Sequence, residues 1–367
     1  MEKDSTIIQK MNEWVTMHLT SIPFVQKIFF VEHLRTMVHA GISLVEALRI
    51  LGKEMENPRF KKIVGFIKSE VEGGKQLSEV LAKYPEVFPS VYIKMIGAGE
   101  TSGQLETSLE QVEQQMKKNQ ELISSIRGAM IYPSVVLAAM GGIGILMVTV
   151  VLPKLIVIFK DFDAELPLAT RMLIVLTDFM SNPVNLSILT VVVVGLITTF
   201  IMLLRRVPKF RHGVHTLNLH LPIAGPIIKQ INLARFSLTL SSLLKSTIPI
   251  IHAVEITADT CTNIRYKEAI TSTAEEIKKG INLSDTLGNY PNLFPPIVTE
   301  MIMVGERSGQ IDQLLQELAT FYSKQVDKTM KNFATIVEPV IILTLGVAVG
   351  GMAVAVIMPM YSLVQNF

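Results

Sequence analysis

Three stretches of the chain are long, apolar and free of charged residues, and each is long enough to cross a lipid bilayer. They extend from about Ser134 to Leu152, from Leu186 to Leu204 and from Val340 to Met358. A backbone in hydrocarbon must satisfy its own hydrogen bonds, so each stretch is predicted to be a helix. Apolar residues make up 49% of the chain and its mean hydropathy is positive, at +0.42, a combination that indicates membrane insertion.

Lysine and arginine near the ends of the spans predict their orientation, because such residues stay on the cytoplasmic side. The basic residues that follow the second span are Arg205, Arg206, Lys209 and Arg211. Basic residues also precede the first and third spans, whereas the loop between the first two carries both signs of charge. The N-terminus, which shows no signal peptide, is therefore expected in the cytoplasm, and the C-terminus on the far side of the membrane.

The chain matches itself when it is shifted by 206 residues, which indicates an internal duplication. GKQLSEVLAKYPEVFP at 74–89 aligns with GINLSDTLGNYPNLFP at 280–295, and GETSGQL at 99–105 aligns with GERSGQI at 305–311. Pro133, where the chain enters the first span, aligns with Pro339 at the third. Each copy is thus a cytoplasmic domain followed by one membrane helix, and the second span returns the chain to the cytoplasm between the copies.

Both cytoplasmic units have apolar residues at helical spacing and no convincing period-two alternation. We expect an all-α polytopic membrane protein with two homologous cytoplasmic helical bundles, about six helices in each, and three transmembrane helices. The predicted order is a leader (1–29), cytoplasmic domain 1 (30–133), the first span (134–152), an extracytoplasmic loop with an amphipathic helix (153–185), the second span (186–204), cytoplasmic domain 2 (205–336), the third span (337–360) and an extracytoplasmic C-terminus (361–367).

The repeated GETSGQL and GERSGQI segments resemble glycine-rich phosphate loops at first sight. No lysine follows their last glycine and no strand pattern precedes them, which excludes the common nucleotide-binding motifs. A turn between two helices fits better, with the first glycine as a helix C-cap and the serine as the next N-cap. The predicted turn residues are Gly99, Ser102 and Gly103, with their counterparts Gly305, Ser308 and Gly309.

A turn of this kind requires no acid, yet Glu100 and Glu306 follow its first glycine in both copies. A repeated carboxylate on an exposed loop is a candidate for contact with a partner protein. A solvated or locally hydrogen-bonded carboxylate is the alternative explanation.

Small residues in the spans predict close helix packing. Gly142 lies four positions after Ala138, and Gly350 lies four positions after Gly346. Such pairs favour contact with another helix, either within this chain or from a partner subunit in the bilayer.

We find no sequence signal for catalysis, a cofactor or a metal. His212, His215 and His220 follow the second span, but their spacing forms a poor metal cage and no acid or cysteine completes a set. Cys261 is the single cysteine of the chain and is expected to be buried. A net charge of +2 does not indicate a nucleic-acid partner.

The paired turns, YPEVFP and YPNLFP upstream of them, Tyr132-Pro133 with its counterpart Glu338-Pro339, and the three-span layout together resemble a known family. It is the inner-membrane platform family of type IV pilus and type II secretion machines (general secretion pathway F, PilC and competence-pseudopilus platforms). The resemblance covers about residue 30 to the C-terminus. Members usually carry a longer leader than the 29 residues found here.

The resemblance implies a non-enzymatic, multi-pass protein of the cytoplasmic (inner) membrane that couples a hexameric assembly ATPase to insertion of pilin or pseudopilin subunits. It also implies contacts with inner-membrane alignment proteins and membrane lipid, and a homo-oligomer. Pilus, secretion and DNA-uptake platforms share this layout. A transporter or channel built from a duplicated unit is the alternative, although such proteins usually place ionisable residues or broken helices at mid-membrane and these spans have neither.

Overall fold

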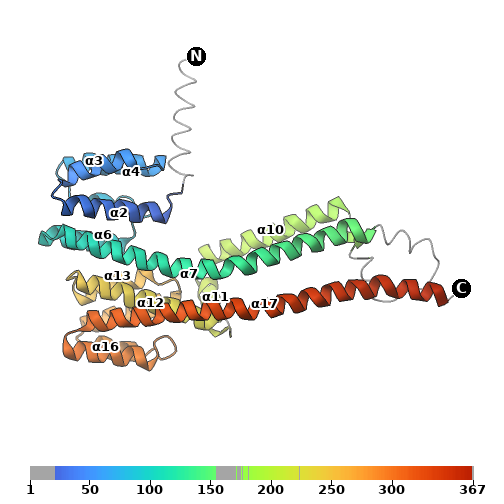
Figure 1. Cartoon of the computed structure of the whole chain (residues 1–367). Helices are drawn as coiled ribbons and strands as arrows, with labels where there is room; N and C mark the ends of the chain where they lie inside the picture. Colours follow the sequence, from blue (N-terminus) through green and yellow to red (C-terminus); the bar gives the residue numbers. More distant parts are fainter. Residues whose placement is uncertain are drawn as a thin grey trace, which may run out of the picture. The chain divides into compact units, whose positions relative to one another are not determined.

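The structure is a computed structural model that describes residues 21–153, 171, 175, 177–180, 182–222 and 224–365. Every regular element among these residues is a helix (Figure 1), which confirms the predicted all-α class. Most of the predicted leader and most of the predicted amphipathic helix in the 153–185 loop lie outside the described residues.

Each copy of the duplicated unit contributes six helices, as the sequence predicted. The first copy contains α2 (Phe24–His39), α3 (Leu44–Glu54), α4 (Pro58–Glu72), α5 (Leu77–Leu81), α6 (Ser90–Ser102) and α7 (Leu105–Leu146). The second contains α12 (Ala224–Lys245), α13 (Ile250–Thr260), α14 (Ile264–Lys278), α15 (Leu283–Gly288), α16 (Pro296–Ser308) and α17 (Ile311–Gln365).

Among the described residues, three helices are long and apolar enough to cross a membrane, in agreement with the three predicted spans. They are α7, which continues as a π-helical turn η1 (Met147–Val151), α10 (Pro183–Arg206) and α17. A further helix, α11 (Pro208–His220), follows α10. The first and third spans are not separate helices, since each is the distal part of a helix that begins well before the predicted span.

Asparagine side chains start the same helix in both copies. The Asn57 side chain accepts hydrogen bonds from the backbone N–H groups of Arg59 and Phe60, each at 3.1 Å, and Asn263 accepts from Arg265 at 2.9 Å. These bonds satisfy N–H groups that have no partner in the first turn of a helix. Asn57 and Asn263 are therefore the N-caps of α4 and α14.

Three aromatic rings occupy equivalent positions at the centre of each copy. In the first, Phe30 lies 5.5 Å from Phe60 and 5.8 Å from Phe88, measured between ring centroids. In the second, the rings are Phe236, Tyr266 and Phe294, with Phe294 5.3 Å and 5.5 Å from the other two. Such edge-on pairs stabilise a core beyond the area they bury. The duplication has therefore preserved the core geometry as well as the sequence.

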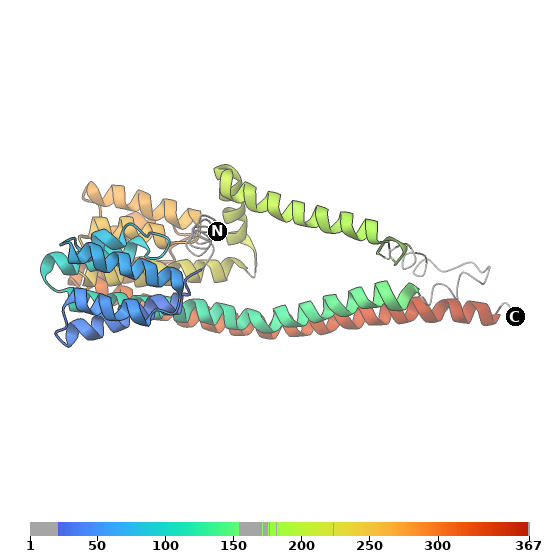
Figure 2. The ribbon, with the colours of Figure 1, turned by 90° about the horizontal axis from the view of Figure 1, so that it is seen from above.

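The parts of both copies outside the predicted spans form one compact unit, made of the described residues up to Ser124 together with Ala224–Val326 (Figures 1 and 2). A second unit contains residues 125–223 and those from Asp327 on. We call the described residues up to 124 lobe 1, and residues 224–326 lobe 2. The boundaries between the two units fall inside α7 and α17, so both helices belong partly to a lobe and partly to the membrane region.

Candidate functional site: the paired turns and the surface between the lobes

Each paired turn ends its helix at the second glycine of the motif, not the first. Gly103 and Gly309 are the C-caps of α6 and α16, and both have a φ of 70°. Glycine tolerates this left-handed conformation because it has no Cβ. The predictions that Gly99 and Gly305 are C-caps are therefore wrong, since α6 and α16 continue one more turn beyond them.

The predictions that Ser102 and Ser308 are N-caps of the following helices are also wrong. Ser102 and Ser308 are the last residues of α6 and α16, and the following helices begin three positions later. The Ser102 hydroxyl donates back to the carbonyl of Ala98 at 2.9 Å. It is thus occupied by its own helix, as serine hydroxyls near helix ends commonly are, and does not cap the next one.

The first glycine of each turn is required by a close approach between helices. A Cβ on Gly99 would lie 2.2 Å from the Cβ of Ser108 on α7, and a Cβ on Gly305 would lie 2.8 Å from the Cα of Ile311 on α17. Both distances are far below van der Waals contact. Glycine at these positions lets the long helix pack directly against the helix before it.

The repeated carboxylate binds the start of a short helix in its own lobe. Glu100 accepts hydrogen bonds from the backbone N–H groups of Leu77 (2.5 Å) and Ser78 (2.9 Å) at the start of α5. Glu306 accepts from Leu283 (2.7 Å) and Ser284 (3.2 Å) at the start of α15. Neither short helix has a side-chain cap of its own.

A carboxylate at this position complements the free N–H groups and the positive end of the helix dipole. Both Glu100 and Glu306 are half-buried, so the local hydrogen-bonding alternative accounts for the repeated acid. Contact of these residues with a partner stays a prediction. The sequence signal for the structural role is the spacing, because each glutamate follows the helix start by the same number of residues in both copies.

The two lobes meet through polar side chains of α7 and α12. The Gln115 amide donates to the Thr239 hydroxyl at 3.2 Å and accepts from the Ser242 hydroxyl at 2.7 Å. One turn earlier, Gln111 accepts from the Ser246 hydroxyl. The helix α6 also contacts α12 and α13. Lobe 1 therefore presents its α6–α7 surface to the α12–α13 surface of lobe 2.

A cavity of about 240 Å³ lies at this surface between the lobes. Its polar lining comes from both copies and includes Tyr92, Gln115, Asn119, Arg235 and Thr260. Burial lowers the pKa of Arg235 and raises that of Tyr92 to about 12. Sequence reasoning missed this cavity, since its residues are not repeated between the copies and come from distant parts of the chain.

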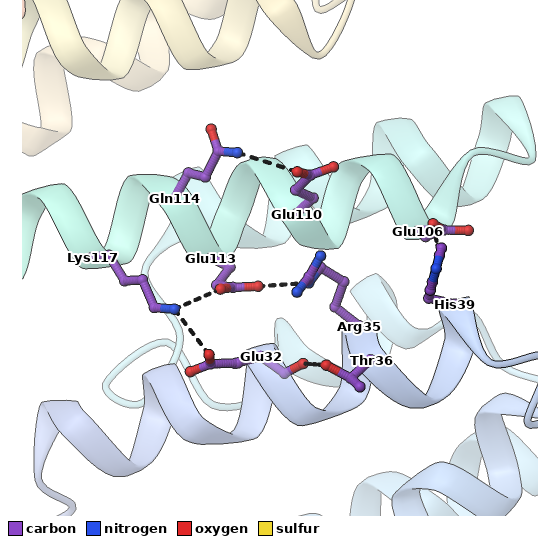
Figure 3. A network of polar contacts seen from close by, with 9 residues as sticks. All are labelled: Glu32, Arg35, Thr36, His39, Glu106, Glu110, Glu113, Gln114 and Lys117. Atoms are coloured by element: carbon purple, nitrogen blue, oxygen red, sulfur yellow. Dashed lines mark hydrogen bonds and ion pairs between the residues drawn. The ribbon is translucent and has the colours of Figure 1, made fainter.

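A network of charged side chains joins α2 to α7 inside lobe 1 (Figure 3). Arg35 Nε lies 2.7 Å from the buried Glu113 carboxylate, and Lys117 Nζ lies 2.7 Å from Glu113 and 3.0 Å from Glu32. Hydrogen bonds to Glu113 and Glu32 raise the pKa of Lys117. The counterparts of Arg35 and Glu113 in lobe 2 are Ser241 and Ala319, so the network is particular to the first copy.

The residues predicted at the membrane lie on the long helices. Pro133 and Pro339 are inside α7 and α17, which continue through them. Arg205 and Arg206 form the last turn of α10, and Lys209 and Arg211 lie on α11. Among the described residues, no atom lies within 4 Å of a Cβ built on Gly142, Gly346 or Gly350, and the helix contact predicted at these glycines stays a prediction.

No group of three or more histidine, cysteine or acidic side chains is placed to hold a metal in the part of the chain that the structure describes. The three histidines singled out in the sequence lie on α11. His220 Nδ1 is 2.8 Å from the carbonyl oxygen of Thr216 in the same helix. Cys261 is buried, as expected, and burial raises the pKa of its thiol to about 12.

Comparison with known proteins matches both copies to one family. The family model described as type II secretion system (T2SS), protein F, matches residues 30–153 and again residues 236–359. The chain is 34% identical over 335 residues to the type IV pilus assembly protein PilC of Thermus thermophilus, covering 91% of this chain and 82% of the relative.

Two further relatives come from pilus and secretion systems. PilC of Pseudomonas aeruginosa is 34% identical, over 91% of this chain and 88% of the relative. Type II secretion system protein F of Vibrio cholerae is 31% identical, over 89% of this chain and 79% of the relative. The matched segments are offset by the same 206 residues as the internal repeat.

Proposed function

The chain belongs to the type II secretion system protein F family, and from this membership we propose a multi-pass assembly platform of the cytoplasmic membrane. It couples a hexameric assembly ATPase to the insertion of pilin or pseudopilin subunits into a type IV pilus or type II secretion fibre. Its relatives are pilus assembly and secretion system proteins, which supports an association with that class of machinery.

One structural observation carries the proposal. The two lobes form a single compact unit, and each continues into a membrane span through one helix without an intervening loop. A helix is held by a continuous ladder of backbone hydrogen bonds, so it transmits a displacement of its lobe along its axis. A loop at the membrane surface would absorb such a displacement. The arrangement supports a protein that passes motion from the cytoplasm into the bilayer.

The partners follow from this role. The ATPase contacts the lobes, with the turns around Glu100 and Glu306 as the proposed contact. Pilin or pseudopilin helices contact the membrane helices, where Gly142, Gly346 and Gly350 present open backbone suited to close packing. The chain also contacts alignment proteins of the inner membrane, and its spans contact lipid. The platform carries no catalytic site or cofactor of its own, and the energy comes from the ATPase.

The test uses the full chain purified in detergent together with the assembly ATPase of the same machine. We expect the chain alone to leave ATP intact and to retain the ATPase on an affinity resin. The variants Glu100→Ala and Glu306→Ala test the proposed contact in lobe 1 and in lobe 2, and Glu56→Ala, on an exposed acid of lobe 1, is the control. ATP hydrolysis by the chain alone, or no retention of the ATPase by the intact chain, would contradict the proposal.

A further inference from the structure

The two lobes are homologous, yet they contact each other through unlike surfaces. Lobe 1 uses its α6–α7 surface and lobe 2 uses its α12–α13 surface. Each lobe therefore also carries the counterpart of the surface that the other lobe uses. On lobe 2 this is the α16–α17 face, defined here by Ile297, Glu317 and Phe321. On lobe 1 it is the α2 face, defined by Phe29, His33 and Ala40.

The α16–α17 face is exposed where its counterpart is buried. Val91 and Gln115 at the contact between the lobes are each 4% exposed, whereas their equivalents Ile297 and Phe321 are 47% and 41% exposed. Isolated apolar residues on a surface need no explanation. Here two of them occupy the positions that form a contact elsewhere in the same molecule.

The α2 face shows the same relationship. Thr239 and Ser246 are buried against lobe 1, whereas His33 is half-buried and Ala40 is exposed. Phe29, the equivalent of Arg235, is 38% exposed, and its ring centroid lies 3.8 Å from that of His33. The turn after each helix is also preserved, with a left-handed residue at Gly41 and at Thr247. The α2 face thus resembles the α12 surface, but no helix of the described residues packs on it as α6 and α7 pack on α12.

The side chains on these two faces are more apolar than those of the contact between the lobes. Phe321 stands where lobe 1 has Gln115, and Phe29 stands where lobe 2 has Arg235. Within one chain, the two lobes are covalently connected, so the polar contact between them needs little affinity. Two separate chains must overcome the entropy of association, and aromatic residues are the ones enriched at the centres of such interfaces.

We propose that the α16–α17 face of one chain binds the α2 face of a second copy, in the way that α6–α7 binds α12–α13 within a chain. Phe321 then lies beside His33, as Gln115 lies beside Thr239, and Glu317 faces the end of α2 near Ala40. The contact joins two different surfaces, so each bound pair of chains leaves one face of each kind free for another copy. Such head-to-tail contacts produce rings or open filaments. This inference does not rest on the function proposed above.

The test is cross-linking between single-cysteine chains in a Cys261→Ala background. One chain carries Phe321→Cys and a large tag, and the other carries His33→Cys and a small tag. Both are expressed together, and membranes are treated with a short bis-maleimide. We expect a product that contains one chain of each kind, and no product when either variant is expressed alone. Gln115→Cys with Thr239→Cys in one chain is the positive control for the homologous contact.

Phe66→Cys is the matched negative control, because Phe66 is as exposed as Phe321, at 41%, but lies on α4 outside both faces. Paired with His33→Cys, it should give no product. Products between two Phe321→Cys chains would indicate a symmetric dimer and overturn the proposal. Absence of any intermolecular product, with position 33 protected in a monomeric chain, would assign the α2 face to another segment of the same chain and would also overturn it.

A second measurement does not depend on cross-linking. Phe321→Gln and Phe29→Arg place the residues of the in-chain contact on the two free faces. We expect each to weaken self-association in detergent by about tenfold or more, with the melting temperature of the lobes unchanged. Self-association that is the same in both variants and in the parent chain would contradict the proposed interface.

Discussion

Glu100 and Ser78 lie twenty-two positions apart, and the carboxylate of the first accepts the backbone N–H of the second at 2.9 Å. The same relationship joins Glu306 to Ser284 in the other lobe. In each case a side chain from one helix caps the start of another, so the repeated acid fixes the position of α5 or α15 against α6 or α16.

Replacing the acid should therefore lower the stability of its lobe. For Glu100→Gln we expect a loss of about 1–2 kcal/mol, because the amide brings no charge to the helix start and satisfies the two N–H groups less well. The measurement is the temperature at which the lobes of the detergent-solubilised chain become protease-sensitive. Glu56→Gln, on an exposed acid without a comparable bond, should change nothing. An unchanged melting temperature with lost fibre assembly would instead favour a partner contact at Glu100.

The close approach at Gly99 makes a second prediction. Gly99→Ala should destabilise lobe 1 by about 1–3 kcal/mol, because the added methyl group would overlap Ser108 and force α6 away from α7. Gly65→Ala is the matched control, since Gly65 lies inside α4 with no atom within 4 Å of a built Cβ. That change should raise stability by up to about 1 kcal/mol. Equal effects of the two substitutions on thermal unfolding would disprove the steric explanation.

The buried thiol of Cys261 and the buried phenol of Tyr92 predict a loss of stability at high pH. Burial raises the pKa of Cys261 from 9.0, and that of Tyr92 from 10.0, to about 12 in the folded protein. The unfolded chain therefore loses these protons first as the pH rises. Stability should be independent of these groups below about pH 8, and should fall from about pH 9 because of Cys261 and from about pH 10 because of Tyr92, up to about pH 12, by about 1.4 kcal/mol per pH unit for each group.

The control for the pH effect is Cys261→Ala. Its melting temperature should fall less between pH 8.0 and 10.5 than that of the parent chain, because the thiol no longer contributes. Tyr92 contributes part of the remaining fall, which should be reduced in Tyr92→Phe, and Tyr266 and Tyr322, whose pKa values burial also raises, contribute with the same sign. If the fall in melting temperature between pH 8.0 and 10.5 is the same in both variants as in the parent chain, burial of these groups does not cause that fall.

The orientation of the chain can be measured with an impermeant maleimide in the Cys261→Ala background. A cysteine at Glu165, in the loop between the first two spans, should be labelled from outside intact cells. A cysteine at the exposed Glu300 in lobe 2 should be labelled after the membrane is opened. The positive-inside distribution of Arg205, Arg206, Lys209 and Arg211 is the reason. Labelling of both positions from the same side would require a different number of crossings.

The spans, the duplication and the helix number could be predicted from the sequence because each rests on a pattern that local residues determine. Apolar length specifies a span, and the offset of 206 residues is visible without any structure. The cap at Asn57 also follows from its neighbours. These features depend on the chain within a few turns of the residue concerned, where periodicity and capping preferences are informative.

The roles of Gly99 and Glu100 could not be predicted in the same way. Two glycines lie near the end of α6, and cap preferences cannot distinguish them. The choice depends on Ser108, which comes against Gly99 when α7 folds back. The role of the Glu100 carboxylate depends likewise on the start of α5, which is distant in the sequence. Tertiary contacts decide both, whereas propensity describes isolated segments. The contact between Gln115 and Thr239 is still further from local information, because it joins the two copies.

The packing of lobe 1 against lobe 2 has a consequence for biosynthesis. The chain emerges from the ribosome in order, so α6 and the part of α7 that belongs to lobe 1 are made before either of the first two membrane crossings, while α12 and α13 appear after both. Throughout that interval Val91 and Gln115 face water, and the nascent first lobe resembles the second lobe of a finished chain. A newly made lobe 1 is then open to a neighbour's α2 face until its own α12 arrives, which makes the speed of translation and membrane insertion a determinant of correct assembly.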